Sequence, residues 1–158
     1  VQFTDNPTLA VVSDSGGSVF ELSFRRTLGV RGVDSKCLFS GSRGEVVTIE
    51  PLLLHQLTSH PLHGSVLIAM ATLSKVIIVS IRPSTRLLLT HSVKASPVSL
   101  PLLSWQFVII QVADTQRIMD PVLAFARDTT IYFYQVSVEA SGRIACVTLQ
   151  QLNLGYSL

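Results

Sequence analysis

The sequence is short of charge, of cysteine and of long apolar runs. Charged residues make up 14% of the 158 residues and hydrophobic ones 47%, which excludes a disordered chain and indicates heavy burial. The two cysteines, Cys37 and Cys146, lie far apart and suggest no disulfide framework, so a reducing cytosolic compartment is expected. The most apolar segment, residues 66–81, contains Lys75 and is shorter than the roughly 20 apolar residues that a membrane helix needs. A membrane-spanning helix is therefore disfavoured.

Sequence motifs of catalysis and of metal binding are also lacking. His55, His60 and His63 lie in one segment, but Pro61 interrupts any helix that would align them, and no cysteine or carboxylate accompanies them. There is no Gly-X-Ser-X-Gly elbow, and the glycine-rich turns lack the spacing and the lysine of a phosphate-binding loop. The acidic residues form no paired motif of the kind that glycosidases use. We therefore predict no catalytic residue, no cofactor and no bound metal.

The sequence does contain a hairpin pattern that occurs three times, at residues 9–24, 68–81 and 123–136. Each copy has an apolar strand of small residues, a short polar turn and a second apolar strand. The central alanines of the first strands are 59 and 55 residues apart, more than the roughly 40–50 residues of a four-stranded propeller blade. The repeat therefore predicts blades that carry one or two long loops each.

Strand and turn signals continue within and between these copies, and no segment has a helical period. Residues 19–24 alternate apolar and polar side chains, as in a half-buried strand, and Gly16-Gly17 provides the positive φ of a tight turn. Two further hairpins are expected over residues 37–49 and 131–149. In the first of them two glycines bracket the expected turn, and Pro51 is expected to end the strand pairing.

Three looser segments, residues 55–64, 92–101 and 113–121, are predicted to be the long loops because they combine proline or polar residues with weak periodicity. Residues 102–112 are predicted to form an apolar strand. Trp105 in that strand is expected to be a core residue rather than an exposed binding aromatic.

These signals together indicate an all-β fold built from antiparallel blades of a WD40-like β-propeller, with a β-sandwich as the alternative. About nine or ten short strands are expected, without intervening helices. Because a closed propeller has typically about 4–8 blades, we expect residues 1–158 to form a partial propeller of about three blades. The segment is expected to be a fragment of a larger propeller domain.

The charge of the chain is mildly basic, with a formal net charge of +2. The basic residues are scattered, so the sequence has no nucleic-acid footprint. The nearest approach to a basic cluster consists of Arg25, Arg26, Arg31, Lys36 and Arg43. This cluster is a candidate surface for binding an acidic partner, and its alternative is a solvated loop.

Several short stretches of the sequence match a known family in their order and approximate spacing. They are residues 17–24, 37–44, 49–52, 101–107 and 121–125, of which 37–44 and 49–52 are the most specific. They resemble the N-terminal propeller of the vacuolar protein sorting-associated protein eight family. The resemblance extends over about residues 9–154.

The resemblance implies a large cytosolic protein in which a WD-like propeller precedes an α-solenoid and a RING domain. It implies a non-catalytic subunit of the CORVET tether that acts in endosomal vesicle tethering and fusion and in transport to the vacuole or lysosome. The implied partners are the class C core vacuolar sorting subunits and an early-endosomal Rab GTPase, with no nucleic acid. Association with early and late endosome membranes would be peripheral and through these partners. The alternative function is that of a propeller-fold hydrolase similar to glycosidases.

Overall fold

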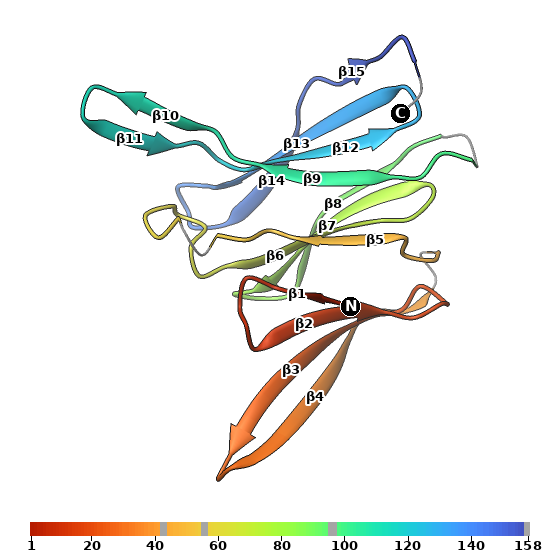
Figure 1. Cartoon of the computed structure of the whole chain (residues 1–158), viewed down its shortest axis with the longest axis vertical. Coiled ribbons are helices and arrows are strands. Elements are labelled where there is room, and N and C mark those ends of the chain that lie inside the picture. The colour runs from red at the N-terminus through yellow and green to blue at the C-terminus, as the bar shows by residue number, and fades with distance from the viewer. Residues whose placement is uncertain (42–43, 55–56, 95–97, 157–158) are drawn as a thin grey trace.

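Three antiparallel sheets follow one another along the chain, each built on a ladder of four strands (Figure 1). They are seen in a computed structural model that describes all residues except 42–43, 55–56, 95–97 and 157–158. The chain order of the strands matches their spatial order in the first two sheets, as expected for propeller blades. The predicted all-β fold with antiparallel blades is confirmed.

The first sheet contains β1 (Gln2–Phe3), β2 (Leu9–Ser13), β3 (Val19–Thr27) and β4 (Val30–Phe39). The second contains β5 (Thr48–Pro51), β6 (Val66–Ala71), β7 (Lys75–Arg82) and β8 (Arg86–Ser92). The third contains β9 (Leu102–Gln106), β12 (Val122–Arg127), β13 (Thr130–Val138) and β14 (Ile144–Thr148), with β15 (Leu152–Asn153) also paired to β13. A separate hairpin of β10 (Ile109–Val112) and β11 (Thr115–Ile118) is inserted between the first two strands of the third sheet.

The three copies of the predicted hairpin are the second and third strands of the three sheets. Ala10 on β2 pairs with Leu22, and the corresponding alanines on β6 and β12 pair with Ile78 and Phe133. The connecting turns differ in length, which is why the copies match in their strands and not in their turns. The repeat therefore marks the centre of each blade.

The middle sheet explains why residues 66–81 are almost continuously apolar. Val66, Ile68 and Met70 on β6 join a core cluster with the first sheet. The alternate residues Leu67 and Ala69 join a second cluster with the third sheet. Because successive side chains of a strand point to opposite faces, a sheet covered on both faces needs apolar residues at every position.

The inner strands β1, β5 and β9 lie next to one another, and β8 and β14 meet farther out. Polar side chains bridge both boundaries between sheets. The Arg82 guanidinium donates to the buried carboxylate of Glu21 in the first sheet. Across the second boundary Arg127 donates to the Leu73 carbonyl at 2.9 Å, and the Trp105 indole donates to the Glu50 carbonyl at 3.0 Å. Trp105 is half-buried and packs against the core, close to its predicted role.

The hairpin predicted over residues 37–49 is wrong. Residues up to Phe39 belong to β4 and pair with β3, whereas β5 pairs with β6 of the next sheet. The connection between the two sheets instead passes over the β2–β3 turn. A Cβ atom on Gly17 would lie 2.1 Å from the Gly44 carbonyl oxygen, so glycine here permits two backbones to approach closely.

The predictions for residues 102–121 are also wrong in part. Residues 102–112 form two strands, β9 and β10, rather than one. The predicted loop at 113–121 contains β11, which pairs with β10 over the whole length of both strands. The predicted hairpin over residues 131–149 is confirmed as β13 and β14, which pair from Tyr134 to Thr148.

Candidate interaction surface

The basic cluster predicted from the sequence lies on the β3–β4 hairpin. These two strands contain 9 and 10 residues, but β2 pairs only with the part of β3 from Val19 to Ser23. Residues 25–32 therefore extend beyond the sheet, at the lower end of the molecule in Figure 1. We call residues 25–32 the β3–β4 arm. The turn at its end consists of Leu28 and Gly29, which have φ angles of 50° and 82°.

The structure divides the predicted cluster between the two faces of this hairpin. Arg26 and Arg31 are cross-strand partners, so both lie on one face. Arg25 lies on the opposite face, as does Lys36, which is opposite Glu21 near the base of the hairpin. The structure thus brings three arginines together on the arm and places Lys36 apart from them. Arg43 lies outside the described residues.

The charges on the two faces of the arm are balanced differently. Arg25 Nε lies 2.7 Å from Asp34 Oδ2, in an ion pair whose side chains are both more than half exposed. Such an exposed pair stabilises the fold little, but it compensates the charge of Arg25. Among the described residues, Arg26 and Arg31 have no ion-pair partner. Their charges are therefore available to a partner molecule.

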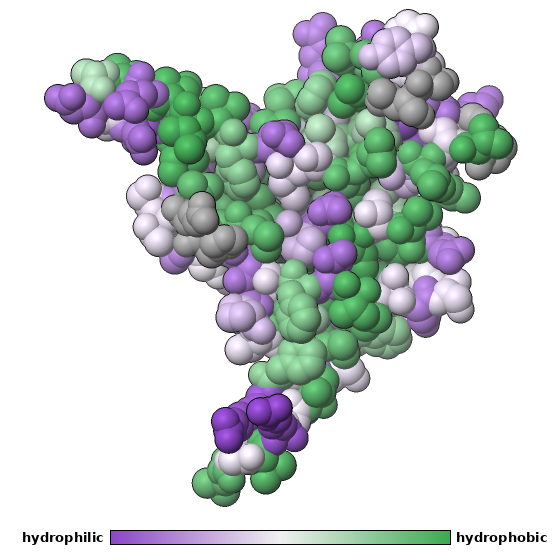
Figure 2. All heavy atoms as spheres, viewed as in Figure 1, coloured by the Kyte–Doolittle hydropathy of each residue, from purple (hydrophilic) through white to green (hydrophobic). Residues whose placement is uncertain are grey.

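Hydrophobic side chains occupy the end of the arm, which the sequence analysis did not single out. Leu28 is 100% exposed and Val30 is 70% exposed. Figure 2 shows a hydrophilic band across the arm and hydrophobic side chains at its end. The sequence contains a hint of this exposed apolar end, because Leu28 precedes Gly29 in a turn where asparagine is the preferred partner of glycine.

The inserted hairpin of β10 and β11 is a second projecting element. Val108, Ile109, Ile110 and Val112 are all exposed, with Val112 at 63%. Figures 1 and 2 show this hairpin extending from the third sheet at the upper left, with hydrophobic side chains along it. Four exposed branched side chains on a two-stranded hairpin are typical of a protein-binding surface.

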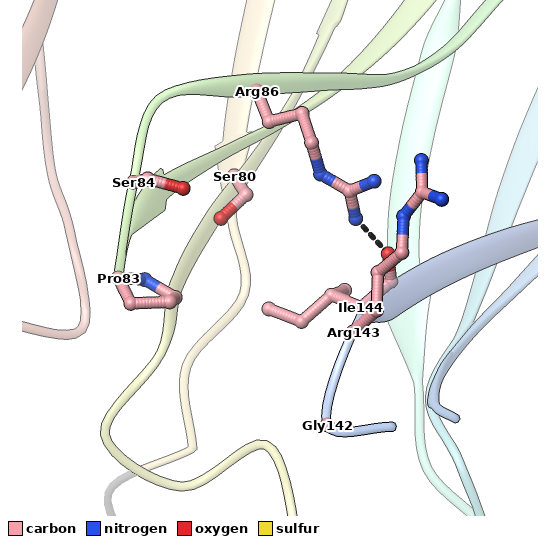
Figure 3. Close-up of a pocket in the computed structure, with 7 residues that line it drawn as sticks. All are labelled: Ser80, Pro83, Ser84, Arg86, Gly142, Arg143 and Ile144. Atoms are coloured by element: carbon pink, nitrogen blue, oxygen red, sulfur yellow. Dashed lines mark hydrogen bonds between the residues drawn. The ribbon is translucent and has the colours of Figure 1, made fainter. Parts of the chain in front are cut away.

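A cleft of about 290 Å³ lies between the second and third sheets. In Figure 3 the Arg86 side chain, from β8, reaches across the cleft and donates to the Ile144 carbonyl on β14. Ser80 and Ser84 line the same cleft, and the described residues that line it include no histidine or carboxylate of the kind that activates a serine nucleophile.

In the segment that contains three histidines, the structure places His60 beside Asp120. The buried His60 accepts a hydrogen bond from the Leu62 amide at Nδ1. Its Nε2 lies 3.2 Å from Asp120 Oδ1, within ion-pair distance but outside hydrogen-bond geometry. Among the described residues, no group of three histidine, cysteine or acidic side chains could hold a metal ion. His55 lies outside those residues.

Both cysteines are free thiols, and their surroundings differ. Cys37 is exposed near the base of the β3–β4 hairpin. Cys146 is half-buried on β14, where burial raises the pKa of its thiol to about 11. Burial also raises the pKa of the Tyr134 hydroxyl, whose oxygen contacts His91 Nδ1 across the boundary between the second and third sheets. The raised pKa of the Cys146 thiol is the opposite of the lowered pKa that a catalytic cysteine needs.

Comparison with known proteins gives a match over the whole chain. The Vps8 beta-propeller family profile matches residues 1–158. The chain is 45% identical over 158 residues to the vacuolar protein sorting-associated protein 8 homolog of Drosophila melanogaster. It is 44% identical over 160 residues to the homolog of Homo sapiens and 43% identical to that of Mus musculus. All of the chain is covered, and it spans 11–13% of the length of these relatives. No solved structure matches.

Proposed function

The chain belongs to the Vps8 beta-propeller family, and from this membership we propose that it is a non-catalytic protein-interaction platform in an endosomal tethering subunit. The family match over all 158 residues is the observation that carries the proposal. The names of the curated relatives place those proteins in vacuolar protein sorting. A propeller suits such a role because a rigid set of sheets holds loops and hairpins in fixed positions for binding.

The proposed assembly is of the CORVET type, acting in vesicle tethering and fusion and in transport from the endosome to the vacuole or lysosome. Its proposed partners are the class C core vacuolar sorting subunits and an early-endosomal Rab GTPase. The protein would act in the cytoplasm and bind early and late endosome membranes through these partners. Among the described residues, the structure contains no helix that could span a membrane.

Residues 1–158 are proposed to supply about three blades of a larger propeller. The first and third sheets each have one face that the middle sheet does not cover. On that face of the third sheet Leu102 and Val147 are 59% and 50% exposed. A neighbouring blade would bury these side chains, and three sheets are too few to close a ring.

The projecting hairpins are the proposed contact surfaces. Arg26 and Arg31 can complement an acidic surface because no described carboxylate compensates them. The exposed apolar residues of the β10–β11 hairpin can pack into a hydrophobic groove of a partner. The two hairpins project from different sheets, so they can engage two partners together.

The proposal is tested by a pull-down of the protein with an early-endosomal Rab GTPase loaded with GTP or with GDP. We expect binding to the GTP form alone. The variant Ile109→Asp on the β10–β11 hairpin is expected to weaken this binding, whereas Leu100→Asp, at a similarly exposed apolar residue elsewhere, should leave it intact. Equal or absent binding in both nucleotide states would contradict the proposal. Glycoside hydrolysis that depends on one carboxylate of this chain would contradict it as well.

A further inference from the structure

The end of the β3–β4 arm combines exposure with a conformation that its residue disfavours. Leu28 is fully exposed, and its φ of 50° lies in the left-handed region, which glycine and asparagine adopt more readily than leucine. No described side chain packs on it, so it contributes nothing to the core of the sheet. In the free protein Leu28 is therefore unfavourable for two reasons. Its apolar side chain is exposed to water, and its backbone adopts a conformation that leucine disfavours.

The arginines lie directly behind this apolar end. Thr27 and Val30 pair at the last step of the ladder, and Arg26 and Arg31 pair at the step before it. At a rise of about 3.3 Å per residue, the backbone positions of Arg26 and Arg31 lie about 3–7 Å behind the turn. Like charges directly opposite each other destabilise a strand pair, so an anion from outside the hairpin would stabilise these two arginines.

We propose that the β3–β4 arm inserts its end into the interface of a bilayer that contains anionic phospholipids. Leu28 and Val30 would enter the boundary between headgroups and acyl chains, and Arg26 and Arg31 would contact lipid phosphates. The spacing between the apolar end and the arginines fits a bilayer interface. Interfacial apolar side chains lie about 5–10 Å deep, and basic side chains stay at the level of the headgroups. The contact adds to the partner-mediated association proposed above and does not depend on it.

An acidic protein surface fits the same arm less well. It would compensate Arg26 and Arg31, but it would leave the apolar end, with Leu28 fully exposed, in water unless it also carried a matching pocket. A bilayer has anionic headgroups at its surface and apolar acyl chains beneath them. This order matches the arginines and the apolar end of the arm, whichever way the arm is rotated about its long axis. The exposed ion pair of Arg25 with Asp34 is compatible with either partner and does not discriminate between them.

The inference is tested by sedimentation of the protein with vesicles of phosphatidylcholine, with and without phosphatidylserine. We expect binding that requires phosphatidylserine and weakens as salt is raised. Leu28→Asn keeps a residue that tolerates positive φ, so the turn is retained while the apolar side chain is lost. This change should lower vesicle binding about tenfold, and Leu100→Asn, at another exposed leucine, should not. Arg26→Gln and Arg31→Gln should each lower it about fivefold.

Insertion itself is measured with an environment-sensitive fluorophore on Leu28→Cys in a Cys37→Ser background, since Cys37 is exposed and would also react. A blue shift on addition of phosphatidylserine vesicles is expected, with no shift on addition of phosphatidylcholine alone. Absence of vesicle binding would overturn the inference. Binding without a blue shift would overturn insertion of the arm. A loss of GTPase binding in Leu28→Asn without a loss of vesicle binding would assign the arm to a protein partner instead.

Discussion

Replacement of Gly17 by alanine tests the packing of the first sheet against the connection that follows it. Gly17 and Gly142 occupy the same position in two similar turns. The Gly17 amide donates to the Asp14 backbone carbonyl at 3.1 Å, and the Gly142 amide donates to the Glu139 backbone carbonyl at 2.9 Å. Their φ angles are 83° and 85°. Gly142→Ala is therefore a matched control that carries the same backbone strain.

The two substitutions differ in what the new methyl group would meet. At Gly142 nothing lies within 4 Å, so the cost is the left-handed strain of about 1–2 kcal/mol less a gain of about 0.4–1 kcal/mol from the stiffer unfolded chain. At Gly17 the new Cβ atom would lie 2.1 Å from the Gly44 oxygen and 2.6 Å from its carbon. Because the backbone of the connection must move, overpacking adds about 1–3 kcal/mol.

Urea unfolding of the protein and of both variants measures the difference directly. We expect Gly142→Ala to lower the free energy of unfolding by about 1 kcal/mol and Gly17→Ala to lower it by about 2–4 kcal/mol. Equal losses in the two variants would refute the close approach of Gly44 to the β2–β3 turn.

The remaining predictions concern the buried Glu21 carboxylate and the half-buried Cys146 thiol. Arg82→Met leaves the Glu21 carboxylate, whose side chain is 3% exposed, without its partner. We expect a loss of about 2 kcal/mol in urea unfolding, below the usual 3–5 because Arg82 is partly exposed, and a partial recovery on adding Glu21→Gln. The Cys146 thiol, with its pKa raised from 9.0 to about 11, should react with a thiol reagent far more slowly than Cys37 at neutral pH. The unfolded chain loses the thiol proton near pH 9, whereas the folded protein keeps it until the pH approaches 11, so the contribution to stability is present below pH 9 and is lost as the pH rises towards 11. Urea unfolding at a series of pH values measures this loss, with Cys146→Ala as the control.

The repeat was predictable from the sequence because the second and third strands of each blade are paired on both sides. Their side chains therefore meet similar surroundings in all three blades. Residues 68–81 are one copy of the hairpin that the sequence predicts, and the structure adds why they lack the usual alternation. They form the middle sheet, which is covered on both faces. The resemblance to the Vps8 family is confirmed by the match over the whole chain.

The connections were less predictable because local turn signals do not reveal which strands pair. Gly41 and Gly44 suggested a hairpin turn, but they belong to a connection between sheets that passes close to another backbone. The β10–β11 hairpin was missed because its apolar residues continue the pattern of β9. The basic residues were found, but only the pairing register shows that Arg26 and Arg31 share one face of the arm.

The proposal of an endosomal interaction platform is tested most directly by the position of the protein in cells. The measurement is the fraction of a fluorescently tagged protein on early endosomes when the Rab GTPase is locked in its GTP form or in its GDP form. The proposed function predicts endosomal recruitment with the GTP form and a diffuse cytoplasmic signal with the GDP form. A distribution that is the same in both states would contradict it.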